Sequence, residues 1–146
     1  FEDALAASVI LTSFIPMLMD TGGNAGSQSS TTVIRGLSLG EIRYGDVLKI
    51  VTTESFVSLM CGATLAVANF AKLMLIDRVS LLVAAVVCLT LVVVVLVSNI
   101  VGCTLPVLAK RVGFDPAVMA SPLITTIVDA VALIIYFNIA KLLLGI

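Results

Sequence analysis

Long apolar runs separated by short polar segments dominate the pattern of this chain. A helix of about 20 apolar residues is needed to cross a hydrocarbon core of about 30 Å. Four such helices are expected, at about residues 4–34, 47–71, 79–109 and 117–140. The third contains LLVAAVVCLTLVVVVLV, which is apolar on every face and does not alternate, so helices are favoured over strands. The pattern predicts an all-α integral membrane protein with a bundle of four transmembrane helices.

Composition agrees with this class. Hydrophobic residues make up 60% of the 146 residues and charged residues 12%, whereas soluble domains carry about 25% charged residues. With a net charge of −1 and no basic tract, the expected environment is the lipid bilayer of a cell membrane, and no nucleic-acid partner is expected. The three cysteines lie inside apolar runs without CxxC spacing, so they are interpreted as packing residues.

Basic residues are distributed unevenly between the two sides of the predicted bundle. The connections at about residues 35–49 and 107–116 carry five Lys and Arg residues, and the opposite side carries three. This excess places those two loops in the cytoplasm and both chain ends outside. A protein that starts in the cytoplasm would then need one more span before Phe1.

The segment PMLMDTGGNAGSQSSTTVIRG is small and polar although it belongs to the first predicted span. Asn24, Gln28 and Thr31 recur at i, i+4 and i+7, which is one face of a helix. Lipid does not tolerate such a face, so it must contact other helices or water. The glycines permit either close helix packing or a local break that exposes carbonyl groups to an ion, and the pattern leaves both open.

Asp129 lies about half-way along the last apolar stretch. The last two spans contain no Lys, Arg or His to neutralise it. Thr125 and Ser121 lie one and two turns earlier on the same face, and Pro122 leaves a carbonyl near residue 118 without its helical donor. Oxygen ligands of this kind suit a hard divalent cation, and Mg²⁺ sheds its waters reluctantly. The alternative is a protonated aspartate that only packs.

Glu54 lies about seven residues inside the second span. It either reaches toward the interface or serves as a ligand in a vestibule. One deep carboxylate per chain is little for a divalent ion, whereas a two-fold axis would bring two copies of Asp129 together. We therefore expect a pore at or near a homodimer interface.

The two halves of the chain share a spacing. Three pairs of similar residues recur about 75 residues apart, as in a parallel internal repeat: Asn24 and Asn99, Arg35 and Lys110, and Glu54 and Asp129. The repeat predicts equal depths for the two asparagines and for the two acids.

Two stretches carry a resemblance to a known family. PMLMDTGGNAGSQSSTTVIRGL resembles the P-x(5–6)-GGNAG-x-Q-x-x-T pattern, and GFDPAVMASPLITTIVDAVALIIYF the D-P-A…P-L…T-x-x-D pattern, of the MgtE magnesium channels and transporters, which have animal relatives among the solute carriers. The resemblance implies a homodimer of five-helix subunits with a pore on the two-fold axis. It implies that the first helix and the family's cytoplasmic regulatory domains are missing here, so that residues 1–146 form one transmembrane pore domain.

The same resemblance assigns roles to residues. Asp129 would bind a hydrated Mg²⁺, Thr125 and Ser121 would be nearby ligands, and Asn24 and Glu54 would be further contacts. Ser121 departs from the asparagine expected there, which weakens its assignment.

Several functions remain open at this point. Transport of Mg²⁺ is the leading prediction, and a Na⁺- or H⁺-coupled exchanger using the same site is the alternative. Oxygen ligands alone would also allow Mn²⁺, Co²⁺ or Ca²⁺. A third alternative is a membrane interaction module that does not transport ions, and its properties would not change on the substitution Asp129→Asn. An intramembrane aspartyl protease needs two membrane-depth aspartates and only Asp129 qualifies, so no enzyme is expected.

Overall fold

The computed structural model describes residues 9–119 and 121–145, and the regular elements within these ranges are all helical. This confirms the predicted fold class. The four long helices and three short helical segments are, in chain order, α2 (Ile15–Ser38), η1 (Tyr44–Asp46), α3 (Val47–Lys72), the π-helical η2 (Leu73–Asp77), α4 (Leu81–Val112), η3 (Pro116–Met119) and α5 (Ser121–Leu144).

The start of α2 corrects the first predicted span, which was placed at about residues 4–34. Residues 9–12 are helical, residues 13–14 form a turn, and α2 then runs to Ser38. Pro16 lies in the first turn of α2, where its missing N–H costs nothing. Residues 1–8 lie outside the described part of the chain.

Three of the described helices are long and apolar enough to cross a membrane: Val47–Asp77, Leu81–Val112 and Pro122–Leu144. The 24 residues of α2 span about 36 Å at 1.5 Å per residue. Its polar residues and glycines, rather than its length, set α2 apart from the other three.

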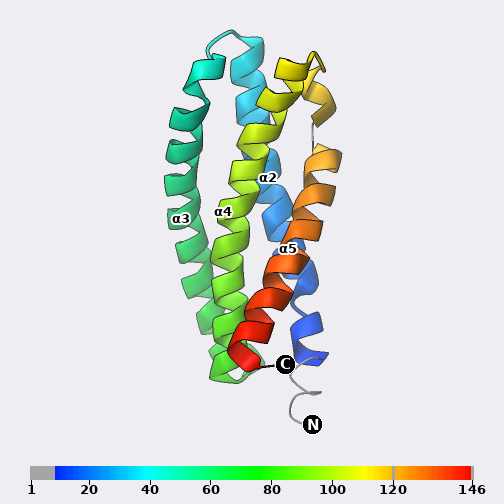
Figure 1. Ribbon diagram of the computed structural model, residues 1–146. Helices are drawn as coiled ribbons and strands as arrows, with labels where there is room; N and C mark the ends of the chain where they lie inside the picture. Colours follow the sequence, from blue (N-terminus) through cyan, green and yellow to red (C-terminus); the bar gives the residue numbers. More distant parts are fainter. Residues whose placement is uncertain (1–8, 120, 146) are drawn as a thin grey trace.

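The central helix is α4, which packs against α3, α2 and α5, while α2 also packs against α5 (Figure 1). The connections 39–46 and 113–120 lie at the same end of the bundle, as the alternation of spans predicts (Figure 1). At this end the Lys110 ammonium donates to the Leu37 carbonyl at 2.9 Å, which ties the end of α4 to the end of α2.

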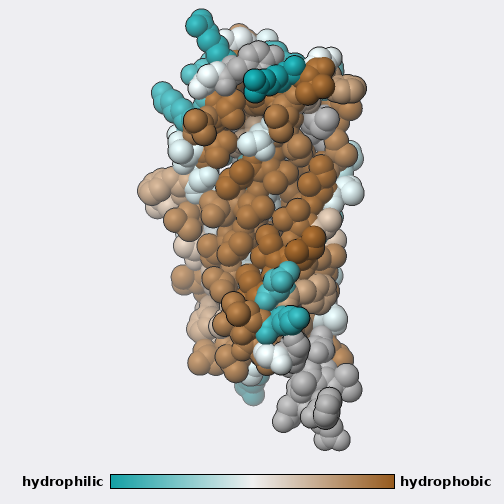
Figure 2. Space-filling view, in the orientation of Figure 1, coloured by the Kyte–Doolittle hydropathy of each residue, from teal (hydrophilic) through white to brown (hydrophobic). Residues whose placement is uncertain are grey.

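The surface seen in Figure 2 is apolar over most of the height of the bundle, and hydrophilic side chains gather at the end that carries these two connections. A smaller hydrophilic group lies near the opposite end. This distribution is the one expected of a bundle surrounded by lipid.

Glycines hold α2 and α4 together. Gly22 and Gly26 face Ser98 and Gly102, so each helix presents two small residues four positions apart. This arrangement lets helix backbones approach closely inside a membrane. Because α2 continues through all its glycines, the glycine segment is a packing seam and not a local break.

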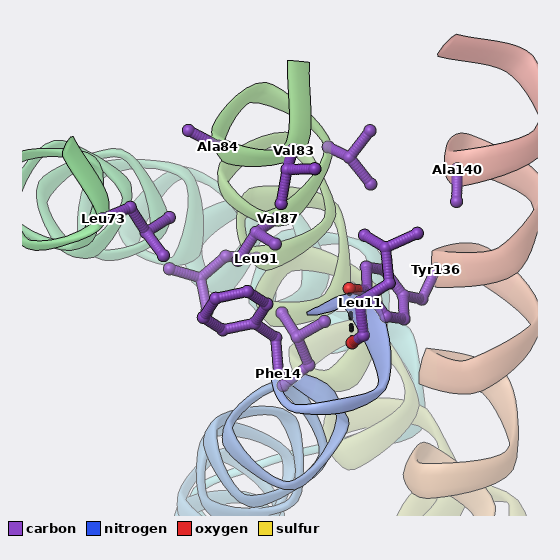
Figure 3. Close-up of a cluster of buried hydrophobic side chains, with 11 residues drawn as sticks. Leu11, Phe14, Leu73, Val83, Ala84, Val87, Leu91, Tyr136 and Ala140 are labelled. Atoms are coloured by element: carbon purple, nitrogen blue, oxygen red, sulfur yellow. Dashed lines mark hydrogen bonds between the residues drawn. The ribbon is translucent and has the colours of Figure 1, made fainter. Parts of the chain in front are cut away.

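Apolar side chains from four segments form a core near the end of the bundle that holds the α3–α4 connection. Phe14 and Leu11 pack there with residues of α4 and α5 (Figure 3). Tyr136 is buried in this cluster, and its hydroxyl donates to the Leu11 carbonyl at 2.8 Å. A second cluster at the other end joins Val33 and Leu37 to Cys103 and Val107.

Two of the three cysteines agree with their interpretation as packing residues, since Cys88 is partly buried and Cys103 is buried, whereas Cys61 is exposed. All three are free thiols, and Cys103 is fully buried in the second cluster.

Candidate ion site

Asp129 lies on α5 where this helix crosses α2. A methyl group on Gly23 would lie 3.8 Å from Asp129 Oδ1 and 3.1 Å from Thr125 Cγ2. The absence of a side chain at Gly23 therefore brings the Thr125–Asp129 stripe of α5 close to α2. Asp129 itself is partly exposed, and Asp20 on α2 is its charged neighbour.

The start of α5 differs from the prediction made from Pro122. This proline is the second residue of α5, so it begins the helix and does not interrupt it. Its carbonyl accepts from the hydroxyls of Thr125 at 3.0 Å and Thr126 at 2.8 Å. Ser121 is the first residue of α5, and its side chain lies outside the described part of the structure.

Glu54 points inward from α3 toward α2. Ser29, which is buried, donates to Glu54 Oε2 at 3.1 Å. Glu54 is partly buried and lies in the second turn of α3. Its orientation favours the interpretation as a vestibule residue over one as an acid reaching into the interface.

A pocket of about 430 Å³, lined by both polar and apolar side chains, separates α2 from α3, with α4 as its floor. Its polar lining residues are Asp20, Thr21, Asn24, Gln28, Ser29, Thr32, Glu54 and Asn99. Asn99 is only 8% exposed; its Nδ2 donates to Ser58 Oγ, and its Oδ1 has no hydrogen-bond partner among the described residues. The pocket thus combines carboxylates with an unpaired buried acceptor.

The structure divides four of the five residues assigned from the sequence into two groups, and the side chain of the fifth, Ser121, lies outside the described part. Thr125 and Asp129 lie at the contact of α5 with Gly23. Asn24 and Glu54 line the pocket between α2 and α3, to which Asp129 does not contribute. The sequence analysis treated these residues as one set and did not predict this separation.

Two contributors were missed as site residues. Asp20 lines the pocket and is also the charged neighbour of Asp129, and Asn99 supplies the unpaired oxygen. The signal for Asp20 was its position one helical turn before Asn24. The signal for Asn99 was a lone amide in an apolar run.

The predicted repeat holds for the order of elements and fails for the acids. Each half has a long helix, a short 3-10 segment and a second long helix, and both asparagines line one pocket. Along α2, however, Glu54 meets Ser29 and Asp129 meets Gly23, six residues earlier. At 1.5 Å per residue this is a difference of about 9 Å, so equal depth for the two acids is wrong along this helix.

Comparison with known proteins identifies the family. The sequence model of the MgtE family, described as a divalent cation transporter, matches residues 15–139. The chain belongs to the MgtE family. The family is described by transport and not by catalysis, which agrees with the expectation from the sequence.

Three curated relatives carry the name magnesium transporter MgtE. The chain is 38% identical to the protein of Thermus thermophilus over 144 residues, 36% to that of Bacillus subtilis over 140 residues, and 30% to that of Enterococcus faecalis over 145 residues. These matches cover 99%, 96% and 97% of the chain. They cover 32%, 31% and 31% of the relatives, so the chain spans about a third of their length.

Proposed function

We propose that this chain forms the pore of a magnesium transporter, in which Asp129 binds a hydrated Mg²⁺ near the two-fold axis of a homodimer. Family membership supports the transport of divalent cations. The names of the three relatives support Mg²⁺ as the transported ion.

A polar stripe on α2 is the observation that carries the proposal. Asp20, Asn24, Gln28, Thr31 and Arg35 are all exposed along one side of α2, beside Asp129 of α5. Charged and amide side chains facing hydrocarbon would cost several kcal/mol. A second copy across a two-fold axis would enclose the stripe and give it water to face.

The chemistry of Asp129 fits a hydrated ion. Among the residues that the structure describes, no three Asp, Glu, Cys or His side chains converge to hold a metal ion. Mg²⁺ keeps several waters and is usually held by one or two carboxylates. Two copies of Asp129, with the oxygens of Thr125 and Ser121 accepting hydrogen bonds from those waters, would supply this arrangement.

The orientation in the membrane follows from the basic residues. Arg35, Arg43, Lys49, Lys110 and Arg111 lie at or near the end that carries the connections 39–46 and 113–120. We assign this end to the cytoplasm.

Ion flux into proteoliposomes tests the proposal. We expect Asp129→Asn, which keeps the shape of the side chain and removes the carboxylate, to reduce Mg²⁺ uptake by more than tenfold, because each of the two copies would lose the group that holds the hydrated ion. Glu41→Gln removes an exposed carboxylate from the 39–46 connection and is the control. Unchanged uptake by Asp129→Asn would refute the role of Asp129 in the pore, whereas no uptake by the wild type would favour a non-transporting module.

A sodium gradient separates the two transport mechanisms in the same assay. A channel carries Mg²⁺ at a rate set by the Mg²⁺ gradient and the membrane potential. Uptake that reverses with an imposed Na⁺ gradient at a clamped potential would identify a coupled exchanger instead.

A further inference from the structure

We propose that the pocket between α2, α3 and α4 is a second cation site, which binds a hydrated divalent cation through Glu54 and the amide oxygen of Asn99. This site is separate from Asp129. The inference rests on the proposed function only in naming a divalent cation as the ligand.

The unpaired oxygen of Asn99 is the first argument. A buried polar atom without a partner costs about 1–3 kcal/mol, so an acceptor of this kind is expected to find a donor or a cation. Asn99 Oδ1 is buried, has no hydrogen-bond partner in the described structure, and belongs to a side chain that lines the pocket. The Ser58 hydroxyl accepts from Asn99 Nδ2, which fixes the amide with its nitrogen on Ser58.

The charge of the pocket selects a cation over other ligands. Glu54 and Asp20 both line it, and no Lys or Arg does. Ser29 donates to Glu54 Oε2 and holds the carboxylate at the pocket wall. An anion or a neutral apolar molecule would meet two carboxylates without a compensating positive charge.

The width of the pocket indicates that the ion keeps its water. Six waters at about 30 Å³ each occupy roughly 180 Å³, which fits within about 430 Å³. A dehydrated ion needs oxygen ligands within about 2.6 Å on several sides. The lining side chains come from three helices around a wide space, so they suit outer-sphere contacts through water.

The position of the pocket connects it to the proposed pore. Asn24 and Gln28 belong both to the exposed stripe of α2 and to the pocket lining. Asp20 lines the pocket and is the charged neighbour of Asp129. An ion in the pocket would therefore lie beside the route to Asp129, with Asp20 between the two sites.

Calorimetric titration of the purified protein with Mg²⁺ tests this site apart from transport. We expect the wild type to show two classes of Mg²⁺ sites. Asp129→Asn should lose one class and Glu54→Gln the other, and in each variant the Mg²⁺ affinity of the altered site should fall by at least about tenfold. Glu41→Gln should retain both. If Glu54→Gln binds Mg²⁺ as the wild type does, the pocket holds water only and the inference is wrong.

A gain-of-charge variant guards against a folding defect in Glu54→Gln. Asn99→Asp places a second carboxylate at the unpaired oxygen, and ligand charge raises the affinity of divalent sites. We expect Mg²⁺ to bind the second site roughly tenfold more tightly in this variant; weaker or unchanged binding would contradict the proposal.

Hexaamminecobalt(III), which cannot shed its ammine ligands, tests hydration. It should displace Mg²⁺ from the second site of Asp129→Asn if the ion is held through its water shell. Failure to compete would exclude outer-sphere binding.

The pore and pocket proposals fail independently. Asp129→Asn with normal uptake would refute the pore and leave the pocket titration unaffected. Glu54→Gln with wild-type titration would refute the pocket and leave the pore intact.

Discussion

Gly26 and Gly102 bring the backbones of α2 and α4 into contact, because a methyl group on Gly102 would overlap the Gly26 carbonyl oxygen. The obstacle is backbone, so no side-chain rotation relieves it. The approach of α2 to α4 at this point thus depends on the absence of a side chain at position 102.

Gly102→Ala is expected to destabilise the protein by about 1–3 kcal/mol, the usual cost of forcing extra volume into a packed interior. Unfolding of the purified protein in detergent, followed by circular dichroism, measures this. Gly45→Ala is the matched control, since a methyl group there meets no atom within 4 Å. Equal stability of the two variants would contradict the conclusion that the packing of α2 against α4 at Gly102 stabilises the bundle.

Gly23→Ala tests the contact between α2 and α5. The added methyl group would lie 3.1 Å from Thr125 Cγ2, so α5 must shift by a few tenths of an ångström. Because Asp129 lies on the same stripe, we expect Mg²⁺ uptake to fall several-fold, while stability changes by less than about 1 kcal/mol. Wild-type uptake would show that the position of Asp129 is not set by this contact.

Ser58→Ala tests the support of the pocket. Ser58 accepts from Asn99 and donates to the Glu54 carbonyl at 2.5 Å, so its removal leaves a buried amide without a partner. We expect a loss of about 1–3 kcal/mol in the free energy of unfolding. Thr64→Val removes an exposed hydroxyl that likewise donates one turn back along α3; it should cost less than half as much.

Tyr136→Phe removes the hydroxyl that joins α5 to the segment before α2. The Leu11 carbonyl would lose its buried donor, and we expect a loss of about 1–3 kcal/mol. Hydrogen exchange should rise in residues 9–14 while α3 stays protected. Unchanged exchange there would mean that packing around Phe14 alone holds the segment.

Hydropathy was enough to predict the spans α3, α4 and α5 to within a few residues, because each has a long apolar run with no competing signal. It did not predict the turn at residues 13–14, since hydropathy does not show that Pro16 lies in the first turn of a helix, where proline is favoured. The spacing of the glycines did not decide whether this segment is a local break in the helix or a surface for close helix packing. The position of α4 against Gly22 and Gly26 decided it.

The candidate sites show a different limit. Helical periodicity predicts which residues share a face of one helix, and it grouped Thr125 with Asp129 correctly. It does not predict which neighbouring helix each face meets, so Glu54 was expected near Asp129 although it lines the pocket between α2 and α3. Asn99 contributes to the candidate pocket because its side-chain oxygen is buried without a partner, and a sequence pattern does not show the burial of a single atom.

The polarity of α2 has a consequence for how the chain enters a membrane. An aspartate in a transmembrane helix opposes insertion, by up to about 2.5–3.5 kcal/mol at the helix centre, and α2 carries Asp20 in its second turn together with two amides and four glycines. By itself α2 would partition poorly into lipid, whereas α3, α4 and α5 would insert on hydropathy alone. We therefore expect the contact of Gly22 and Gly26 with α4 to help retain α2 in the bilayer.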